Sequence, residues 1–183
     1  MSSKHKIVDH QALHFITFAT IQWIDALSRP SYKHIVVESL RYCQQEKGLI
    51  LYAFVIMSNH VHLIASAAEG KSLSDILRDL KKYTSKQLLK ELRENPQESR
   101  KSWMMWLFRS AGDSNSNNQD YQFWQQDNHP IELSTNDMMD QRLDYIHMNP
   151  VKEELVREPE HYPFSSAIDY AGGRGLLDLT MIS

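Results

Sequence analysis

Residues 49–67 read LILYAFVIMSNHVHLIASA, and this stretch decides the fold. Two apolar, β-branched runs flank the polar pair Ser58-Asn59, which is the pattern of a β-hairpin. Successive side chains of a strand point to opposite faces, so His60 and His62 share a face with their Cα atoms roughly 6.5–7 Å apart. Two imidazoles in this relation could chelate one metal ion. The alternative is a pair of ordinary histidines on a half-exposed strand, because a His-x-His pair alone is a weak signal.

The segments around the hairpin complete a β-α-β-β-α-β order. Strand patterns cover residues 13–20, 49–57, 60–67 and 121–126, and helical patterns cover residues 32–46 and 72–95. Ser72, followed by Asp75, has the form of a helix-capping box. This order predicts an α+β, ferredoxin-like antiparallel sheet with helices on one face.

The rest of the chain predicts a C-terminal helical extension. A helix over residues 135–148, ended by Asn149-Pro150, precedes a short helix near residues 165–170. Residues 103–108 fit either a strand or a helix, and residues 111–120 are expected to form a loop. We expect one domain over residues 1–183, with a core of about 10–134 and the extension at about 135–183.

Composition excludes several classes of protein. The single cysteine, Cys43, rules out an intramolecular disulfide framework and a Cys-rich zinc module. No apolar run approaches the ~18 residues of a membrane span, and the first residues, MSSKHKIVDHQ, lack the apolar core of a signal peptide. The expected location is therefore the cytoplasm.

Charge is unevenly distributed along the chain. The formal net charge is −3 and the pI about 6.3, which argues against an indiscriminate nucleic-acid binder. Residues 71–109 nevertheless carry ten Lys and Arg against five Asp and Glu, whereas residues 111–183 carry four against thirteen. The basic segment would attract a phosphate backbone, although it could also be an ordinary solvated helix face. The basic residues that recur every four positions are Arg78, Lys82, Lys86 and Lys90.

The long predicted helix carries a tyrosine and a glutamine four residues apart. Tyr83 and Gln87 project from nearly the same face of this helix, at the edge of the apolar stripe that must face the sheet. A tyrosine there is commonly a core residue whose hydroxyl reaches outward, whereas a half-buried glutamine needs polar partners. The pair is therefore a candidate for chemistry, with core packing as the alternative for Tyr83.

The strand and the helix are close in sequence, so we expect His60, His62 and Gln87 to converge on one point. Neutral nitrogen and oxygen ligands without a thiolate suit Mg²⁺ or Mn²⁺ better than a closed structural zinc site. Tyr83, one turn from Gln87, would then lie within reach of a metal-bound phosphate.

Four separated motifs resemble the single-tyrosine HUH transposases of the IS200-like family, and within them the REP-associated tyrosine transposases. The motifs are VIMSNHVHLI, LRDLKKYTSKQ, FWQQDNHPIEL and LDYIHMNPVKEELVREPEHYPFSSAIDY, and they span about residues 13–170. The resemblance implies a ferredoxin-like core and cleavage of single-stranded DNA, usually near a hairpin. It implies a metal-binding pair in His60 and His62, a nucleophile in Tyr83 and a third ligand in Gln87. It gives no catalytic role to Trp124, Asn149 or Pro150, which lie in its later motifs.

The resulting hypothesis is a metal-dependent DNA strand transferase that forms a 5′-phosphotyrosine. Mg²⁺ or Mn²⁺ would polarise the scissile phosphate, the basic helix residues would position the backbone, and Trp124 could stack on unpaired bases, with a core position as its alternative. The expected partner is single-stranded or hairpin DNA at the nucleoid, and no membrane. The resemblance allows a homodimer as well as a monomer.

Two other functions fit parts of the pattern. A non-catalytic module could bind single-stranded nucleic acid on the same kind of sheet, and its binding would be insensitive to EDTA. A small zinc hydrolase would need a carboxylate base near the histidines, and the sequence between Asn59 and Ala67 offers none.

Overall fold

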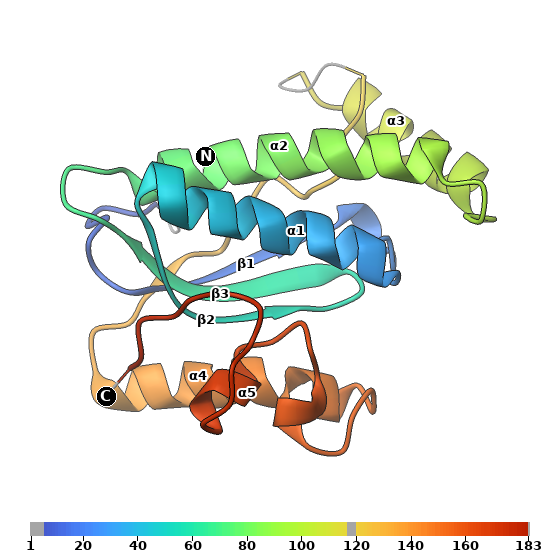
Figure 1. The fold of residues 1–183 in the computed structure, drawn as a ribbon. Coiled ribbons are helices and arrows are strands. Elements are labelled where there is room, and N and C mark those ends of the chain that lie inside the picture. The colour runs from blue at the N-terminus through green and yellow to red at the C-terminus, as the bar shows by residue number, and fades with distance from the viewer. Residues whose placement is uncertain (1–5, 117–119, 183) are drawn as a thin grey trace.

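The strands β1, β2 and β3 lie at the centre of the molecule (Figure 1). With β4 they form an antiparallel sheet of four strands in the order β2-β3-β1-β4. This computed structural model describes residues 6–116 and 120–182. The strands are β1 (His14–Ala19), β2 (Leu49–Ile56), β3 (His60–Ala67) and β4 (Ile131–Glu132). This is the strand order of a ferredoxin-like sheet, and the predicted α+β fold class is confirmed.

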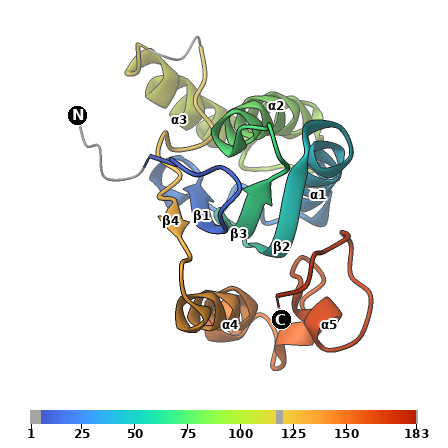
Figure 2. The same cartoon turned by 90° about the vertical axis from the view of Figure 1, so that its left-hand side faces the viewer.

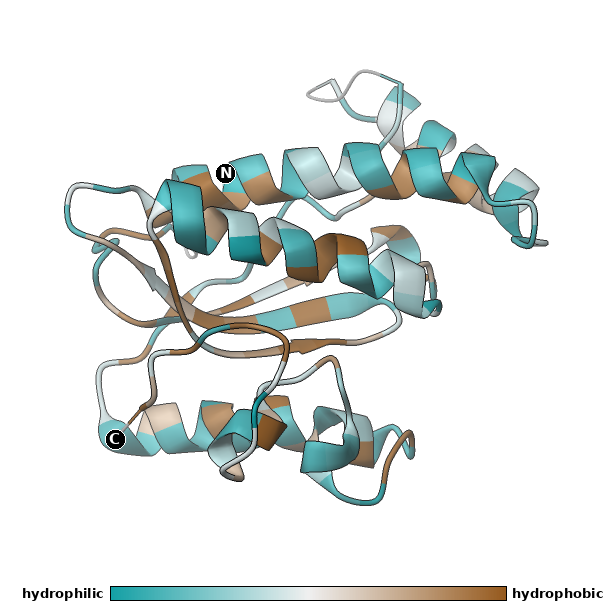
Figure 3. Ribbon diagram, viewed as in Figure 1, coloured by the Kyte–Doolittle hydropathy of each residue, from teal (hydrophilic) through white to brown (hydrophobic). Residues whose placement is uncertain are grey.

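Two helices cover one face of the sheet. They are α1 (Pro30–Tyr42) and α2 (Leu73–Glu94), and α3 (Lys101–Asp113) packs beside α2. The predicted cap is present, because Ser72 Oγ accepts a hydrogen bond from the Asp75 backbone N–H at 3.2 Å. α1 continues into a π-helical turn, η3 (Cys43–Lys47), which ends at Gly48 with φ of 80°. The strands are largely hydrophobic and each helix is hydrophobic on only part of its surface (Figure 3), so the core lies between these layers.

The C-terminal extension covers the opposite face (Figure 2). It contains α4 (Asn136–Lys152), which contacts β2 and β3, together with η4 (Pro159–His161) and α5 (Ala167–Tyr170). Thr135 caps α4 by accepting a hydrogen bond from the Met138 backbone N–H at 3.2 Å. The sheet is therefore enclosed by α1 and α2 on one side and by the extension on the other.

The fourth strand differs from the sequence prediction. Within residues 121–126, Trp124 alone forms a β-bridge, to Thr20, the residue that follows β1. The edge strand forms later, at Ile131–Glu132. Phe123 and Trp124 are both buried although they are consecutive. A strand that pairs with the sheet alternates its side chains between two faces, so this segment instead runs irregularly along the edge of the core.

The ends of two helices also differ from the sequence prediction. α4 does not stop at Asn149-Pro150 but continues to Lys152, because proline removes only its own N–H and Asn149 still accepts from the Glu153 backbone N–H at 3.1 Å. Residues 103–108 are helical, and α3 extends to Asp113, inside the predicted loop 111–120. Residues 117–119 of that loop lie outside the described residues. Across the described ranges, no helix is long and apolar enough to cross a membrane.

Candidate active site

The two histidines of β3 form the centre of the site. His60 and His62 lie on the same face of the strand with ring centroids 4.6 Å apart. Both side chains are buried, and both face α4 rather than α1 and α2, as their contacts below show. The predicted spacing of two imidazoles on one face is therefore present.

Each ring is held through its Nδ1 atom. His60 Nδ1 lies 2.7 Å from Asn59 Oδ1, and His62 Nδ1 lies 2.7 Å from Thr17 Oγ1 on the neighbouring strand β1. The other nitrogen of His62, Nε2, is buried and has no hydrogen-bond partner in the described part of the chain. An orphaned buried nitrogen needs an explanation, and a ring fixed at one nitrogen with the other open is the usual arrangement of a metal-binding histidine.

Burial keeps both imidazoles neutral. Burial lowers the pKa of His60 to about 4, and burial together with the nearby His60 and Arg142 lowers the pKa of His62 to about 3. At neutral pH both rings therefore present an unprotonated nitrogen, which is the form that binds a metal.

α4 contributes a tyrosine and an asparagine to the same place. The ring centroid of Tyr145 lies 5.2 Å from that of His62 and 5.9 Å from that of Phe15 on β1. The Asn149 side chain lies close enough to His60 to act on its pKa, which it raises against the larger lowering by burial. Tyr145 and Asn149 are four residues apart, so they share one face of α4, and the fully buried Ile146 anchors that face against the core. Tyr145 remains 38% exposed, and substrate therefore has access to it.

Two cations flank the tyrosine. The Arg142 guanidinium lies 4.7 Å from the centre of the Phe15 ring, and Lys152 Nζ lies 5.4 Å from the centre of the Tyr145 ring. The site thus combines two neutral imidazoles, an amide, a phenol and two positive charges. Positive charge beside an exposed phenol suits an anionic substrate such as a phosphodiester.

The donor set fits a divalent ion. No group of three or more His, Cys, Asp or Glu that could hold a metal occurs among residues 6–116 and 120–182. The ligands available at this site are instead His60, His62 and the amide of Asn149. Two imidazoles and an amide oxygen leave several coordination positions for water and phosphate oxygens, as Mg²⁺ and Mn²⁺ require.

The structure does not bring Tyr83 and Gln87 to the histidines, so the expected convergence of His60, His62 and Gln87 is wrong. Both residues line a groove of about 800 Å³ between α1 and α2, on the opposite side of the sheet. Tyr83 is 56% exposed there, and is therefore not the core residue of the alternative interpretation either. The spacing of four residues correctly put both on one helix face, but that face borders α1.

The predicted DNA-binding residues also lie away from the histidines. Arg78 is engaged by Asp75 at 2.6 Å and Asp79 at 3.1 Å, while Lys82 and Lys86 line the α1–α2 groove and Lys90 is exposed on α2. Trp124 is only 4% exposed, packs edge-on against Phe18, and donates from Nε1 to Thr84 Oγ1 at 3.0 Å. No face of this indole is open to a base, so its predicted stacking role is wrong and the alternative core position is correct.

Sequence reasoning did not connect α4 with the two histidines. The motif LDYIHMNP contains Tyr145 and Asn149 at the same spacing as Tyr83 and Gln87, and that spacing was the available signal. Nothing local indicates which of two such helices lies on the histidine face. That choice depends on the path of the chain after β4.

These features define a ferredoxin-like protein with a paired-histidine site closed by a tyrosine-bearing helix. Residues 9–118 match the family described as "Transposase IS200 like", and the chain belongs to this family. The matched residues include both histidines and end before α4. No curated protein matches the sequence.

Two solved structures are similar. The structure of a REP-associated tyrosine transposase bound to a REP hairpin has a TM-score of 0.67 and 20% identity, over 100% of this chain and 96% of that chain. At this identity the likeness shows the fold. A crystal structure of a proposed transposase from Deinococcus radiodurans R1 has a TM-score of 0.47 and 15% identity, over 80% of this chain and 95% of that chain.

Proposed function

We propose that this transposase cleaves and rejoins single-stranded DNA beside hairpins, with Tyr145 as its nucleophile. The observation that carries the proposal is the meeting of His60 and His62 with Tyr145 and Asn149 on one side of the sheet. The family match supports DNA transposition. The hairpin bound by the REP-associated relative supports a hairpin substrate here.

A divalent cation such as Mg²⁺ or Mn²⁺ is the expected cofactor. His60, His62 and Asn149 would hold it, and Asn59 and Thr17 would orient the two rings. When bound, the ion supplies charge neutralisation and polarisation of the scissile phosphate.

The chain's own residues then perform the transfer. A bond forms between the phenolic oxygen of Tyr145 and the phosphorus, and the bond from phosphorus to the 3′ oxygen breaks. The phenol proton passes to solvent, the departing 3′ oxygen takes up a proton, and the 5′ phosphate remains on the tyrosine. Attack by a 3′ hydroxyl on this ester reverses the step and joins two strands. Arg142 and Lys152 hold the backbone by charge.

The main alternative, a non-catalytic module that binds nucleic acid on its sheet, is less well supported. Such modules stack bases on an open sheet face. Here α1 and α2 cover one face and α4 covers the other. A zinc hydrolase is disfavoured as well, since the contacts of His60 and His62 come from amide, hydroxyl and aromatic groups and a guanidinium.

The test is formation of a covalent protein–DNA adduct. Purified protein is incubated with 5′- and 3′-labelled hairpin oligonucleotides and Mn²⁺, and the products are separated on a denaturing gel. We expect an adduct that carries only the label 3′ to the cut, and its absence in EDTA. DNA binding without an adduct in Mn²⁺ and Mg²⁺ would favour the binding module instead.

A further inference from the structure

An exposed tryptophan lies directly beside the histidine pair. Trp23 is 50% exposed, and its ring centroid lies 5.4 Å from that of His60 with an interplanar angle of 60°. It ends the 3-10 turn η2 (Ile21–Trp23), which follows β1. One side of the indole is therefore covered by a proposed metal ligand while much of the ring remains open to solvent.

The backbone under Trp23 is strained. Gln22 has φ of 51° and Trp23 has φ of 55°, and the left-handed region is unfavourable for residues with a Cβ. Two consecutive residues of this kind persist only where the surroundings hold them. The surroundings here include Thr20, whose backbone O accepts from the Trp23 N–H at 3.0 Å and whose Oγ1 donates to Ile24 O at 2.8 Å.

One side chain holds the tryptophan turn and the histidine together. Asn59 Oδ1 lies 2.7 Å from His60 Nδ1, while Asn59 Nδ2 donates to Trp23 O at 3.2 Å and to Asp25 Oδ1 at 3.2 Å. The positions of the Trp23 backbone and the His60 ring are therefore coupled through a single amide.

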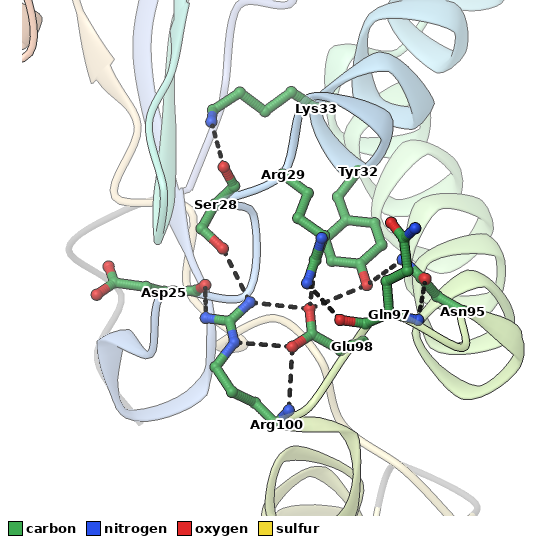
Figure 4. A network of polar contacts seen from close by, with 9 residues as sticks. All are labelled: Asp25, Ser28, Arg29, Tyr32, Lys33, Asn95, Gln97, Glu98 and Arg100. Atoms are coloured by element: carbon green, nitrogen blue, oxygen red, sulfur yellow. Dashed lines mark hydrogen bonds and ion pairs between the residues drawn. The ribbon is translucent and has the colours of Figure 1, made fainter.

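An ion network around the buried carboxylate of Glu98 holds the residues that follow this turn (Figure 4). Arg100 donates to Asp25 O at 3.0 Å and to Ser28 Oγ at 2.8 Å, and it is itself held by Glu98 at 2.9 Å. Arg29 donates to the second oxygen of Glu98, also at 2.9 Å. Residues 25–29 are thus fixed to the start of α3, so the strained turn is a rigid feature of the site.

We propose that Trp23 is the stacking platform for the unpaired base next to the scissile phosphate. This inference rests on the proposed function, because it needs DNA at His60. A rigid, half-open indole offers every base a flat apolar partner without regard to sequence. Its place beside His60 puts the stacked base next to the phosphate on which Tyr145 acts. The two other exposed tryptophans, Trp103 and Trp106, belong to α3 on the far side of the sheet, so neither is placed to stack on this base.

The test compares binding of two DNA probes in EDTA, where no cleavage takes place. One probe is a hairpin with a single-stranded flank, and the other is the same hairpin without the flank. Binding is followed by fluorescence anisotropy for wild type, Trp23→Ala, Trp23→Phe and Trp106→Ala. Trp106 is 68% exposed against 50% for Trp23, so Trp106→Ala removes a still more accessible indole away from the site.

We expect Trp23→Ala to weaken binding of the flanked hairpin by roughly tenfold or more, with binding of the unflanked hairpin unchanged. Trp23→Phe, which keeps an aromatic ring, should retain most of the affinity, and Trp106→Ala should match wild type. Equal binding of the flanked probe by wild type and Trp23→Ala overturns the inference. So does an equal loss on both probes, or an equal loss in Trp106→Ala. The wild-type adduct assay in Mn²⁺ decides the proposed function separately, because the binding comparison requires no chemistry.

Discussion

Tyr145 of α4 and His62 of β3 lie with their ring centroids 5.2 Å apart, although 83 positions separate them in the sequence. The contact exists because the C-terminal extension returns across the face of the sheet that α1 and α2 leave uncovered. In the proposed function this contact distinguishes Tyr145 from Tyr83 of α2, which is more exposed (56% against 38%) but lies on the other side of the sheet.

Tyr145→Phe should abolish covalent adduct formation. The variant keeps the ring that packs against His62 and Phe15 and removes only the attacking oxygen, so folding and DNA binding should stay near wild type. We expect adduct formation to fall by roughly three orders of magnitude or more. Tyr83→Phe is the matched control, and it should retain wild-type adduct formation because Tyr83 lies in the α1–α2 groove. The opposite pattern would return the nucleophile to α2.

The active site should be complete within one chain. Since His62 and Tyr145 of the same chain are in contact, a mixture of Tyr145→Phe and His62→Ala proteins should recover no adduct. Each variant lacks one half of the site, and a trans arrangement would rebuild one intact site in each mixed dimer. Adduct formation is measured for each variant alone and after the two are mixed and incubated together. Activity regained on mixing would show that the tyrosine helix is exchanged between subunits.

Thr17→Val should weaken metal binding. Thr17 Oγ1 contacts His62 Nδ1 at 2.7 Å, and loss of the partner that orients a ligating imidazole costs about 10- to 100-fold in metal affinity. Titration calorimetry with Mn²⁺ measures the effect directly. Thr84→Val is the control, because it removes a buried hydroxyl that accepts from Trp124 Nε1 on the far side of the sheet. It should cost about 1 kcal/mol of stability and leave Mn²⁺ affinity unchanged. Equal Mn²⁺ affinities in the two variants would mean that Thr17 does not orient a ligand.

Local sequence patterns were sufficient for most of the fold. Alternation placed His60 and His62 on one face, and the Ser72 cap and the apolar stripe located α2. These features depend on residues within a few positions of one another. The sequence predictions that the structure does not bear out depend on long-range contacts. Residues 121–126 have strand-like composition, but long-range contacts hold them, among them those of Lys81, which donates to the Gln125 backbone O at 2.6 Å and to Asn128 Oδ1 at 2.7 Å.

The choice between Tyr83 and Tyr145 as the proposed nucleophile also depends on long-range contacts. A tyrosine and an amide at a spacing of four residues occur on both α2 and α4, and the spacing is equally good on each. Only the tertiary path puts α4 on the histidine face. The expected binding of DNA by the basic residues of α2 stays a prediction, although one of them, Arg78, is engaged by Asp75 and Asp79 within its own helix.

Acid should destabilise the protein through Glu98. This carboxylate is fully buried, and hydrogen bonds from Arg100, Arg29 and Tyr32 lower its pKa from 4.5 to about 2. A depressed pKa stabilises the folded state above the unfolded value of 4.5, and this stabilisation is lost as the pH falls from about 4.5 towards 2. The full effect is about 3 kcal/mol.

Urea unfolding of wild type and Glu98→Gln between pH 7 and pH 3 measures this effect. Glu98→Gln should be destabilised at pH 7, because Arg29 and Arg100 lose their counter-charge, and the difference from wild type should shrink as the pH falls. The exposed Glu94→Gln should differ little from wild type at any pH. A constant difference between Glu98→Gln and wild type over the whole range would contradict the role of Glu98 in acid unfolding.

Charge reversal should affect DNA binding differently on the two sides of the sheet. Lys152 lies at the end of α4 with Nζ 5.4 Å from the centre of the Tyr145 ring, whereas Lys86 lines the groove between α1 and α2. If the DNA backbone lies along the α4 side, Lys152→Glu should weaken binding of many hairpin sequences alike, since a phosphate contact carries no sequence information. It should also make the negative slope of log affinity against log salt concentration shallower by about one.

Lys86→Glu makes the same change of charge on the opposite face. It shifts the net charge of the protein equally, so any long-range effect of net charge is common to both variants. What remains is the local contact, which only Lys152 is placed to make. Anisotropy titrations at several salt concentrations should therefore separate the two variants, with the larger loss and the smaller slope for Lys152→Glu. A larger loss for Lys86→Glu would instead place the DNA on the basic face of α2, and it would leave the exposed phenol of Tyr145 without its substrate.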